Sequence, residues 1–431
     1  MGPLGSPAFG EGRAMRAVSL FSGCGGFCEG IELAGFDIAV AVEYDRYACM
    51  TYRANFPKTP LFEGDIHDFL KKGSGHETQY RLQDIDLVFG GPPCQGYSQI
   101  GPRDLFDNRN ELYLQFARVV KALKPRMLLM ENVPNLLLME KGHFRDKILQ
   151  HLGSLGYRNV TFVKVSAADY GVPQTRERVF FFGTRDDLRL PFPLRDYALA
   201  LLTKLQVKTP VTVKEAIGDL PAEIVHSGET MPYPAPDGLS AFAKAMRLDA
   251  SAGPYTKAVK RRRAIGRGDD ALLHNHHTKE MQEKRRKLIS FLKPGCKADS
   301  LPVEIWNNAR PEKWRRLHPD LPSHTILAQM HRDLSEWIHP GLERWITVRE
   351  AARLQSFHDG FVFKGSEWQQ LKQVGNAVPP LLGYAAARMI KGVLEACDGR
   401  IEDPGIPMQG VLLPDMPAVA AKRRNREPAL A

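Results

Sequence analysis

Apolar residues between positions 16 and 184 recur in short runs, separated by longer segments with helical spacing. Runs of strand character cover 16–21, 38–42, 85–89, 127–130, 158–167 and 178–184. Helical spacing covers 27–34, 45–54, 110–123 and 143–154, and it returns at 347–357 and 381–396. Such alternation is typical of a mostly parallel sheet covered by helices. The pattern therefore predicts an α/β fold with a doubly wound, Rossmann-like sheet.

The regular pattern is lost in the middle of the chain. Residues 190–344 are rich in Pro and in basic residues, and their apolar positions are only weakly periodic. We therefore expect one domain formed by 14–189 together with 345–398, and a second, smaller domain formed by 190–344. In the second half of the first domain, Thr347 and Glu350 have the spacing of a helix capping box.

The two ends of the chain are expected to lie outside these domains. Residues 1–13 begin like a protease-site and cloning remnant, and they carry no charged-then-apolar leader. Residues 399–431 combine prolines with a basic run, which predicts a disordered tail. No apolar run approaches the roughly eighteen residues of a membrane helix, and the six cysteines include no CxxC pair. We therefore expect a cytoplasmic protein with reduced thiols and no metal site.

Positive charge is concentrated in one window. The chain has 59 Lys or Arg and 49 Asp or Glu residues, and 257–316 alone holds 17 of the former and 7 of the latter, a net charge of +10. Such a window indicates a polyanion-binding surface, with nucleic acid as the leading partner. We expect Arg261, Arg262 and Arg263 to contact phosphates. We interpret His274–His277 as a polar loop within reach of phosphate.

Residues 90–98 read Gly-Gly-Pro-Pro-Cys-Gln-Gly-Tyr-Ser and directly follow the strand 85–89. Gly and Pro end a strand abruptly, so Cys94 should lie in a loop past its carboxyl end. Ligands bind at that edge in open α/β sheets. A cysteine that follows two prolines there suggests a fixed nucleophile. The alternative is a buried cysteine that packs as a small apolar group.

A glycine-rich turn, Phe21–Gly26, joins the first strand to the first helix. Glycines let the backbone approach a ligand, and the helix start offers free N–H groups, although a tight turn without a ligand is an equal alternative. Glu43 ends the second strand, where a carboxylate can hold ribose hydroxyls, and Asp65 can accept from an adenine amino group. Cys28 occupies the third glycine position of the dinucleotide fingerprint. A smaller adenosine cofactor is therefore favoured over a dinucleotide.

Six ordered blocks of the chain resemble those of the DNA (cytosine-5) methyltransferases. They are Leu20–Gly26, Gly91–Gln95, Glu131–Val133, Gln174–Arg178, Arg349–Phe357 and Gly375–Pro380. The chain departs from the family pattern at Ser19, where many members have Asp, and at His358, which replaces a usual Pro. The resemblance implies a class I methyltransferase fold, with 190–344 as target-recognition domain.

The resemblance also implies the cofactor and the chemistry. S-adenosyl-L-methionine, released as S-adenosyl-L-homocysteine, would be bound by Phe21, Ser22, Gly23, Gly25, Gly26, Glu43, Tyr44, Asp65, Ile66, Pro93, Leu112, Asn376 and Ala377. Cys94 would add to carbon 6 of a flipped-out cytosine, and Glu131 would supply a proton or hydrogen bond at ring nitrogen 3. Arg178 would contact the carbonyl of the base, and Arg176 would orient Cys94 or the adjacent phosphate.

The same resemblance suggests how this enzyme contacts its substrate. Duplex DNA would be bound by Gln95, Ser98 and Gln174 in addition to the basic window, and 95–108 would close as a lid. The resemblance therefore also suggests a bacterial protein that is associated with the nucleoid, acts as a monomer and is paired with a restriction endonuclease. Nothing in the sequence identifies the target site.

Three other functions were compared with this one. An exocyclic amino methyltransferase is excluded because Pro92-Pro93 is followed by Cys94 where that class has an aromatic residue. An RNA (tRNA) cytosine-5 methyltransferase of the same fold stays open, although the basic window favours duplex DNA. A catalytically silent DNA-binding module is disfavoured because Cys94, Glu131 and Arg178 are all present.

Overall fold

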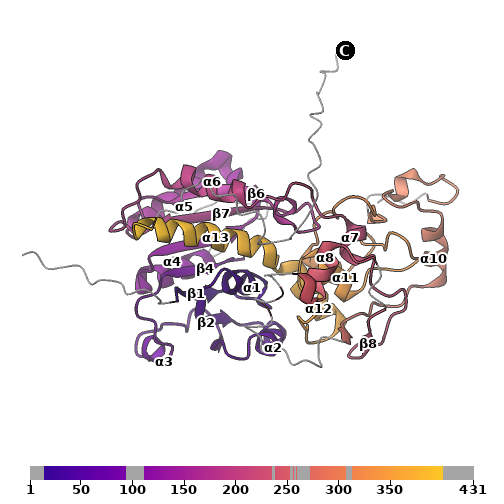
Figure 1. Cartoon of the computed structure of the whole chain (residues 1–431), viewed down its shortest axis with the longest axis horizontal. Coiled ribbons are helices and arrows are strands. Elements are labelled where there is room, and N and C mark those ends of the chain that lie inside the picture. Colours follow the sequence, from indigo (N-terminus) through magenta and orange to yellow (C-terminus); the bar gives the residue numbers. More distant parts are fainter. Residues whose placement is uncertain are drawn as a thin grey trace, which may run out of the picture.

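The computed structural model describes residues 14–93, 111–234, 238–252, 256, 259, 272–306 and 313–400. The described residues form two lobes that lie side by side (Figure 1). The first lobe contains a seven-stranded sheet between helices, and the second is built from short helices and loops.

The sheet has the strand order β3-β2-β1-β4-β5-β7-β6. The strands β1 to β5 pair in parallel, and β7 runs antiparallel to both β5 and β6. The mostly parallel, doubly wound sheet is thereby confirmed. The strand bounds are β1 Arg16–Leu20, β2 Asp37–Glu43, β3 Leu61–Glu63, β4 Leu87–Gly90, β5 Met127–Asn132, β6 Thr161–Ser166 and β7 Glu177–Thr184.

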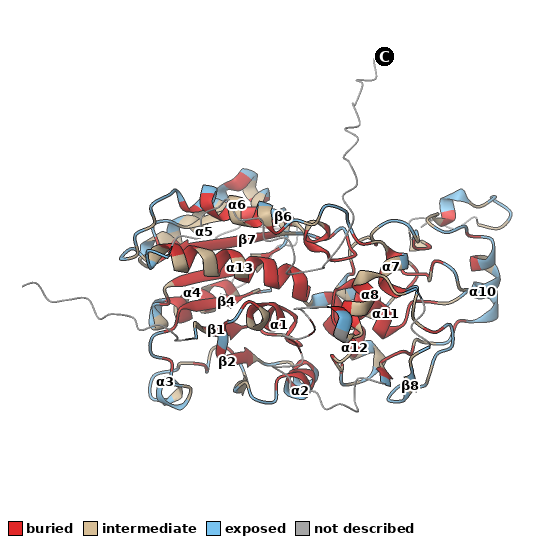
Figure 2. Ribbon diagram, viewed as in Figure 1, coloured by how far each residue is buried: buried red, intermediate tan, exposed pale blue. Residues whose placement is uncertain are grey.

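Alternate residues of the central strands face two separate apolar cores. Phe180 and Phe182 of β7 lie in the core that includes α1 (Gly26–Leu33), α6 (Leu194–Lys204) and α13 (Pro380–Cys397). Phe181 lies in the other core, with α4 (Glu111–Leu123) and α5 (His143–Ser154). Strands buried on both faces read as continuous apolar runs, which is why the sequence located them. Figure 2 shows the buried sheet and α13 within the more exposed outer helices.

The remaining elements of the first lobe are short. They are α2 Arg46–Asn55 and α3 His76–Gln79, with the 3-10 turns η2 Pro134–Leu137, η3 Met139–Gly142 and η4 Ala167–Tyr170. The helix α2 begins where the Asp45 side chain accepts hydrogen bonds from the backbone of Tyr47 and Ala48. Because Asp45 lies two residues after Glu43, this cap fixes the turn that carries Glu43.

The second lobe contains α7 Val213–Ile217, α8 Ala241–Met246, α10 Glu283–Ser290, α11 Val348–Leu354 and α12 Glu367–Asn376, with β8 Thr230–Pro232 paired to β9 Leu272–His274. Its 3-10 turns are η5 Ala250–Ala252, η7 Ala298–Ser300 and η9 Ala328–His331. The capping box predicted for Thr347 and Glu350 is present at the start of α11.

Contacts between helices extend across the boundaries expected at 190 and 345. The helix α6 packs against α13 and β6, so the chain up to Lys204 belongs to the first lobe. The helix α11 contacts α7 and α12 contacts η9, so both lie with the second lobe. Of the last three helices, only α13 returns to the sheet (Figure 1). Sequence spacing located these helices but not their packing partners, because packing depends on contacts between distant segments.

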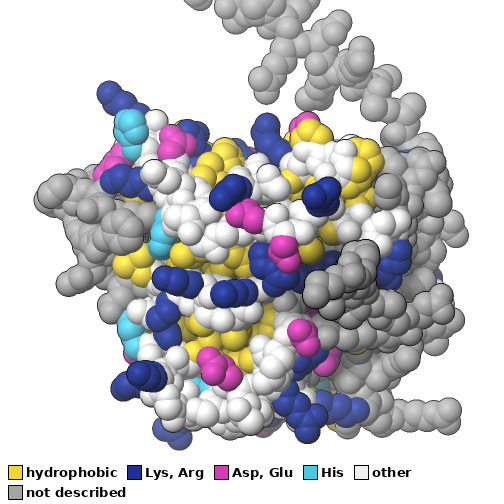
Figure 3. All heavy atoms as spheres, turned by 90° about the vertical axis from the view of Figure 1, so that its left-hand side faces the viewer, with side chains coloured by type: hydrophobic (Ala, Val, Ile, Leu, Met, Phe, Trp, Pro, Cys, Tyr) yellow, Lys and Arg dark blue, Asp and Glu magenta, His cyan; other side chains and the backbone are white. Residues whose placement is uncertain are grey.

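The order of the strands reverses between β1 and β4, which is where open α/β sheets bind ligands. A Cβ atom on Gly90 of β4 would lie 2.3 Å from the Leu20 carbonyl oxygen, so the two strand ends are tightly apposed. At the far end of the first lobe, Lys and Arg are scattered among acidic and apolar side chains (Figure 3). No helix among the described residues is long and apolar enough to cross a membrane.

Candidate active site

The turn after β1 is compressed against two other segments. Phe21, Gly23 and Gly25 have φ values of 55°, 55° and 102°. A Cβ atom on Gly25 would lie 2.3 Å from the Phe56 ring, and one on Gly26 would lie 2.5 Å from the Val378 carbonyl oxygen. These two positions therefore require glycine for packing alone. At Gly23, by contrast, no heavy atom would lie within 4 Å of such a Cβ atom, so open space faces the turn.

The Glu43 carboxylate lies beside this open space. It accepts hydrogen bonds from the backbone N–H groups of Gly23 at 2.7 Å, Tyr44 at 3.0 Å and Asp45 at 2.8 Å. Burial raises the pKa of Glu43, and these three hydrogen bonds oppose that shift. The two carboxylate oxygens offer about four lone-pair sites. Tyr44 and Asp45 bond Oε1 and Gly23 bonds Oε2, so an acceptor site remains on Oε2 for a ligand hydroxyl group.

The other predicted cofactor residues surround the same end of the sheet. The Tyr44 ring is 76% exposed, and Asn376 is exposed at the end of α12. Asp65 follows β3, where hydrogen bonds from the backbone and ring of His67 lower its pKa. A Cβ atom on Gly26 would lie 3.2 Å from the Cβ atom of Ala377. The segment after α12 therefore packs on the glycine-rich turn. Of the other residues predicted to bind the cofactor, Ser22 and Ile66 are buried, Leu112 is partly buried and Pro93 is exposed.

These groups fit an adenosine cofactor. An exposed aromatic side chain, a held carboxylate with a free acceptor site and an exposed Asn lie around glycine backbone at the crossover of the sheet. Together they offer stacking for a base and an acceptor for a ribose hydroxyl.

A buried ion pair lies at the carboxyl ends of β4 and β5. Glu131 Oε1 is 2.7 Å from Arg178 Nε, and the two side chains are 12% and 11% exposed. A Cβ atom on Gly91 would lie 3.0 Å from Glu131 Oε2, so the loop that leads to Cys94 passes directly over this carboxylate. Asn132 Nδ2 donates to the Pro92 carbonyl at 3.4 Å. The sheet therefore brings the predicted acid, the predicted base-binding arginine and the nucleophile loop together.

The predicted residues Cys94, Gln95, Ser98, Arg261, Arg262 and Arg263 lie outside the described residues. Three other thiols of the first lobe are poor nucleophiles. Burial raises the pKa values of Cys24, Cys28 and Cys49 to about 12, so all three stay protonated near neutral pH. Cys28 Sγ is also 3.1 Å from Oγ of Ser19, the residue that replaces the Asp found in many members of the family.

Arg176 and Gln174 are buried, which does not support the DNA contact expected for Gln174 or the phosphate contact expected for Arg176. The other role expected for Arg176, orienting Cys94, stays a prediction. Gln174 is fully buried, and its side chain donates to the Leu354 carbonyl at 3.0 Å and accepts from Ile326 N at 2.7 Å. Arg176 is 3% exposed and donates to the carbonyls of Ile326 and Gly375 at 2.7 and 3.3 Å. Neither side chain can therefore reach a phosphate in this arrangement.

The loop 274–277 is also not a phosphate contact. His276 and His277 are 0% and 3% exposed, and burial lowers the pKa of both. His276 Nε2 donates to the Pro221 carbonyl at 3.0 Å, and its Nδ1 is 3.2 Å from Thr347 Oγ1. The histidines join segments of the second lobe, because the loop lies against the start of α11.

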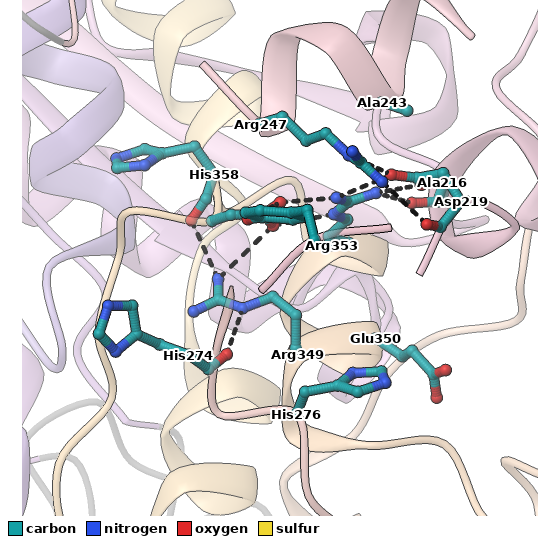
Figure 4. A network of polar contacts seen from close by, with 12 residues as sticks. Ala216, Asp219, Ala243, Arg247, His274, His276, Arg349, Glu350, Arg353 and His358 are labelled. Carbon is teal, nitrogen blue, oxygen red and sulfur yellow. Dashed lines mark hydrogen bonds and ion pairs between the residues drawn. The ribbon is translucent and has the colours of Figure 1, made fainter. Parts of the chain in front are cut away.

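Sequence reasoning missed a buried ionic network where α11 meets α7 (Figure 4). Arg353 Nε and Nη2 donate to the Asp359 carboxylate at 2.8 and 2.6 Å, and the same guanidinium contacts Asp219. Asp219 also accepts from Arg247 Nε at 2.7 Å. Burial alone would lower the pKa of Arg353, but Asp359 and Asp219 raise it above its usual range. The available signal was the spacing of Arg349 and Arg353, which places two cations on one face of the same helix.

Part of the basic window is structural. Arg316 is 8% exposed and donates to the carbonyls of Leu292 and His339 at 2.9 and 3.1 Å. In contrast, Lys284–Lys287 on α10 are exposed at the far side of the second lobe (Figure 1).

Comparison with known proteins agrees with this geometry. The model of the C-5 cytosine-specific DNA methylase family matches residues 15–392. The type II methyltransferase M.AgeI of Thalassovita gelatinovora is 33% identical over 428 residues, covering 88% of this chain and 99% of that protein. M.DdeI of Desulfomicrobium norvegicum is 34% identical over 395 residues, covering 88% and 89%. A putative DNA modification methyltransferase from an E. coli prophage has a structure with a TM-score of 0.69 and 28% identity, covering 89% of this chain and all of that one.

The fold and the site define a class I methyltransferase. This chain belongs to the C-5 cytosine-specific DNA methylases. It is therefore an enzyme that transfers a methyl group from S-adenosylmethionine to carbon 5 of cytosine in DNA.

Proposed function

We propose that the enzyme methylates one cytosine within a specific duplex sequence and protects that sequence from a paired restriction endonuclease. The Glu131–Arg178 pair carries this proposal, because it supplies an acid and a cation beside Gly91, three residues before the predicted nucleophile in the sequence. The type II names of the relatives support the pairing with an endonuclease. We further propose a monomer that acts in the bacterial cytoplasm at the nucleoid.

Cys94 is proposed as the nucleophile. Its thiolate forms a bond to carbon 6 of cytosine, and the ring electrons then make carbon 5 nucleophilic. Glu131 donates a hydrogen bond or proton at ring nitrogen 3, and Arg178 holds the carbonyl oxygen of the base. After the methyl group is transferred to carbon 5, that carbon loses its proton, and the carbon–sulfur bond breaks to restore the ring, the thiolate and the proton lent to ring nitrogen 3. Thiols suit this role because they are nucleophilic even with a few per cent of thiolate present.

Residues on three strand ends would hold the cofactor. Glu43 accepts from the ribose, Tyr44 and Phe21 cover the adenine, and Asp65 accepts from its amino group. Asn376 closes the site from the segment after α12. S-adenosylmethionine, when bound, supplies the electrophilic methyl group. The open space at Gly23 beside the Glu43 carboxylate supports this assignment.

The DNA is proposed to lie against the second lobe. The target cytosine is inside a stacked duplex, so it must be flipped out at a cost of a few kcal/mol. We propose that Gln95 and Ser98 contact the flipped nucleotide, that 95–108 closes over it, and that Arg261, Arg262 and Arg263 bind phosphates. The exposed cations of α10 support a basic surface in this lobe.

Bisulfite sequencing of DNA from cells that express the chain tests the proposal. We expect protected cytosines at one position of one short sequence, and none in cells that express Cys94→Ala. Methylation at scattered cytosines without a common sequence, or in RNA alone, would contradict it.

Replacing Glu43 by Gln is expected to weaken cofactor binding by about tenfold or more, because hydrogen bonds to charged groups contribute about 1.5–3 kcal/mol. Gln keeps one carbonyl oxygen for the N–H groups of Tyr44 and Asp45, so the turn should persist. Calorimetric titration with S-adenosylhomocysteine measures the change, with the thermal midpoint of each protein as the folding control. Unchanged affinity in a folded variant would exclude Glu43 from the cofactor site.

A further inference from the structure

Two side chains before β7 connect three segments that are distant in sequence. Gln174 Oε1 accepts from Ile326 N at 2.7 Å, and its Nε2 donates to the Leu354 carbonyl and to Gln355 Oε1 at 3.0 and 3.1 Å. Gln355 Nε2 in turn donates to the Val374 carbonyl at 2.7 Å. Gln174 thereby links the segment at Ile326, the end of α11 and the end of α12.

Arg176 connects two of these segments, at Ile326 and at the end of α12, through its guanidinium. Its two amino groups donate to the carbonyls of Ile326 and Gly375, at 2.7 and 3.3 Å. Gly375 directly precedes Asn376, the residue proposed to close the cofactor site. Two residues further along the chain, Arg178 pairs with Glu131. Arg176 therefore lies between the base-binding pair and the cofactor segment.

The backbone at Leu327 is packed directly on Gly375. A Cβ atom on Gly375 would lie 2.4 Å from the Leu327 carbonyl oxygen and 2.6 Å from Ala328 N. Closely packed backbones cannot move independently, because interiors are too dense to deform continuously. A displacement of 326–328, which extends from the second lobe, must therefore displace Gly375 and the residue that follows it.

The charge of Arg176 is not required for packing. Burial lowers the pKa of Arg176 to about 9, and no carboxylate in the described part of the chain lies within ion-pair distance of it. A buried cation without a counter-ion is costly. A neutral side chain of similar length would fill the same space, so the guanidinium is explained better by the two carbonyls that it holds together.

We infer that Arg176 and Gln174 are positioning residues that couple DNA binding to cofactor binding. The inference rests on the proposed function, in which the second lobe binds DNA. When DNA fixes the second lobe, Ile326 and Gly375 are fixed together, and Asn376 is held in place for the cofactor. By linkage, the cofactor must strengthen DNA binding by the same factor.

The coupling factor is measured from four dissociation constants. Fluorescence anisotropy gives the affinity for a labelled target duplex with and without saturating S-adenosylhomocysteine, and calorimetry gives the affinity for that compound with and without duplex. We expect each ligand to tighten the other by about fivefold or more in the unmodified enzyme, within the usual range of such couplings. In Arg176→Lys, which can reach one carbonyl but not both, the factor should fall to near one.

Arg316→Lys is the matched control. Arg316 is likewise buried and donates to backbone carbonyls, but within the second lobe. The Arg316→Lys variant should have a lower thermal midpoint than the unmodified enzyme but the same coupling factor. Gln174→Met provides a second test if Arg176→Lys does not fold, because it removes the links to Ile326 and Leu354 without adding charge.

A folded Arg176→Lys or Gln174→Met enzyme with full coupling would overturn the inference, and so would an unmodified enzyme without coupling. Failure of the proposed function would be recognised separately, since the unmodified enzyme would then neither methylate nor bind any duplex sequence preferentially.

Discussion

Cys94→Ala should lose methyl transfer by about 10⁴-fold or more, the usual result of removing a catalytic nucleophile. Binding of cofactor and of duplex should persist, because the groups that hold the cofactor belong to other strand ends. Transfer of a radiolabelled methyl group to target duplex measures the loss of activity, and calorimetry measures the binding of cofactor and of duplex. Residual transfer within about tenfold of the unmodified enzyme would show that Cys94 is not the nucleophile.

A duplex with 5-fluorocytosine at the target position isolates the covalent step. After Cys94 adds to carbon 6 and carbon 5 is methylated, that carbon carries fluorine instead of a removable proton. The carbon–sulfur bond then cannot break by elimination, so enzyme and DNA should stay joined through denaturing electrophoresis. The adduct should require S-adenosylmethionine and map to Cys94 by peptide mass.

Cys49→Ala is the matched control for this experiment. The Cys49 thiol has the pKa of about 12 that burial imposes, and it lies on α2 rather than on the loop after β4. The variant should therefore form the adduct at the normal rate. An adduct at Cys49, or at any cysteine other than Cys94, would require a different mechanism.

The sequence predicted the elements of the sheet because their causes are local. Continuous apolar runs mark strands buried on both faces, and the capping box of Thr347 and Glu350 encodes the start of α11 within four residues. These predictions needed no knowledge of distant contacts. The proximity of Glu131 and Arg178, in contrast, depends on the pairing of β5 with β7, which the sequence pattern did not predict.

The roles of Gln174, Arg176 and His276 could not be predicted in this way. Each is a polar residue whose partners lie more than fifty positions away, and its burial depends on those partners. From the sequence alone, a polar side chain whose distant partners are unknown is expected at the surface. Here backbone carbonyls of other segments satisfy the buried groups, so tertiary contacts override the local expectation.

Arg353→Leu should lower the free energy of unfolding by about 3–5 kcal/mol, the range observed when one partner of a buried ion pair is removed. The loss would leave the carboxylates of Asp219 and Asp359 in a site where Arg353 is fully buried. Asp219 would retain its ion pair with Arg247. Asp359 would keep only the hydroxyl of Tyr233 at 2.7 Å and Arg349 at 3.9 Å, so its carboxylate would lose its close counter-ion. Urea denaturation followed by tryptophan fluorescence measures the effect, because Trp337 and Trp345 are buried in the second lobe.

Arg185→Leu is the control for this stability change, since Arg185 pairs with the exposed carboxylate of Asp187 and exposed ion pairs contribute about 0–1 kcal/mol. Combining Arg353→Leu with Asp359→Asn should recover part of the lost stability, because it removes the carboxylate that is left without a close cation. If Arg353→Leu lost no more stability than Arg185→Leu, the network would not hold α11 against α7. The junction would then have to be stabilised by its apolar contacts alone, and the two buried arginines of α11 would need another explanation.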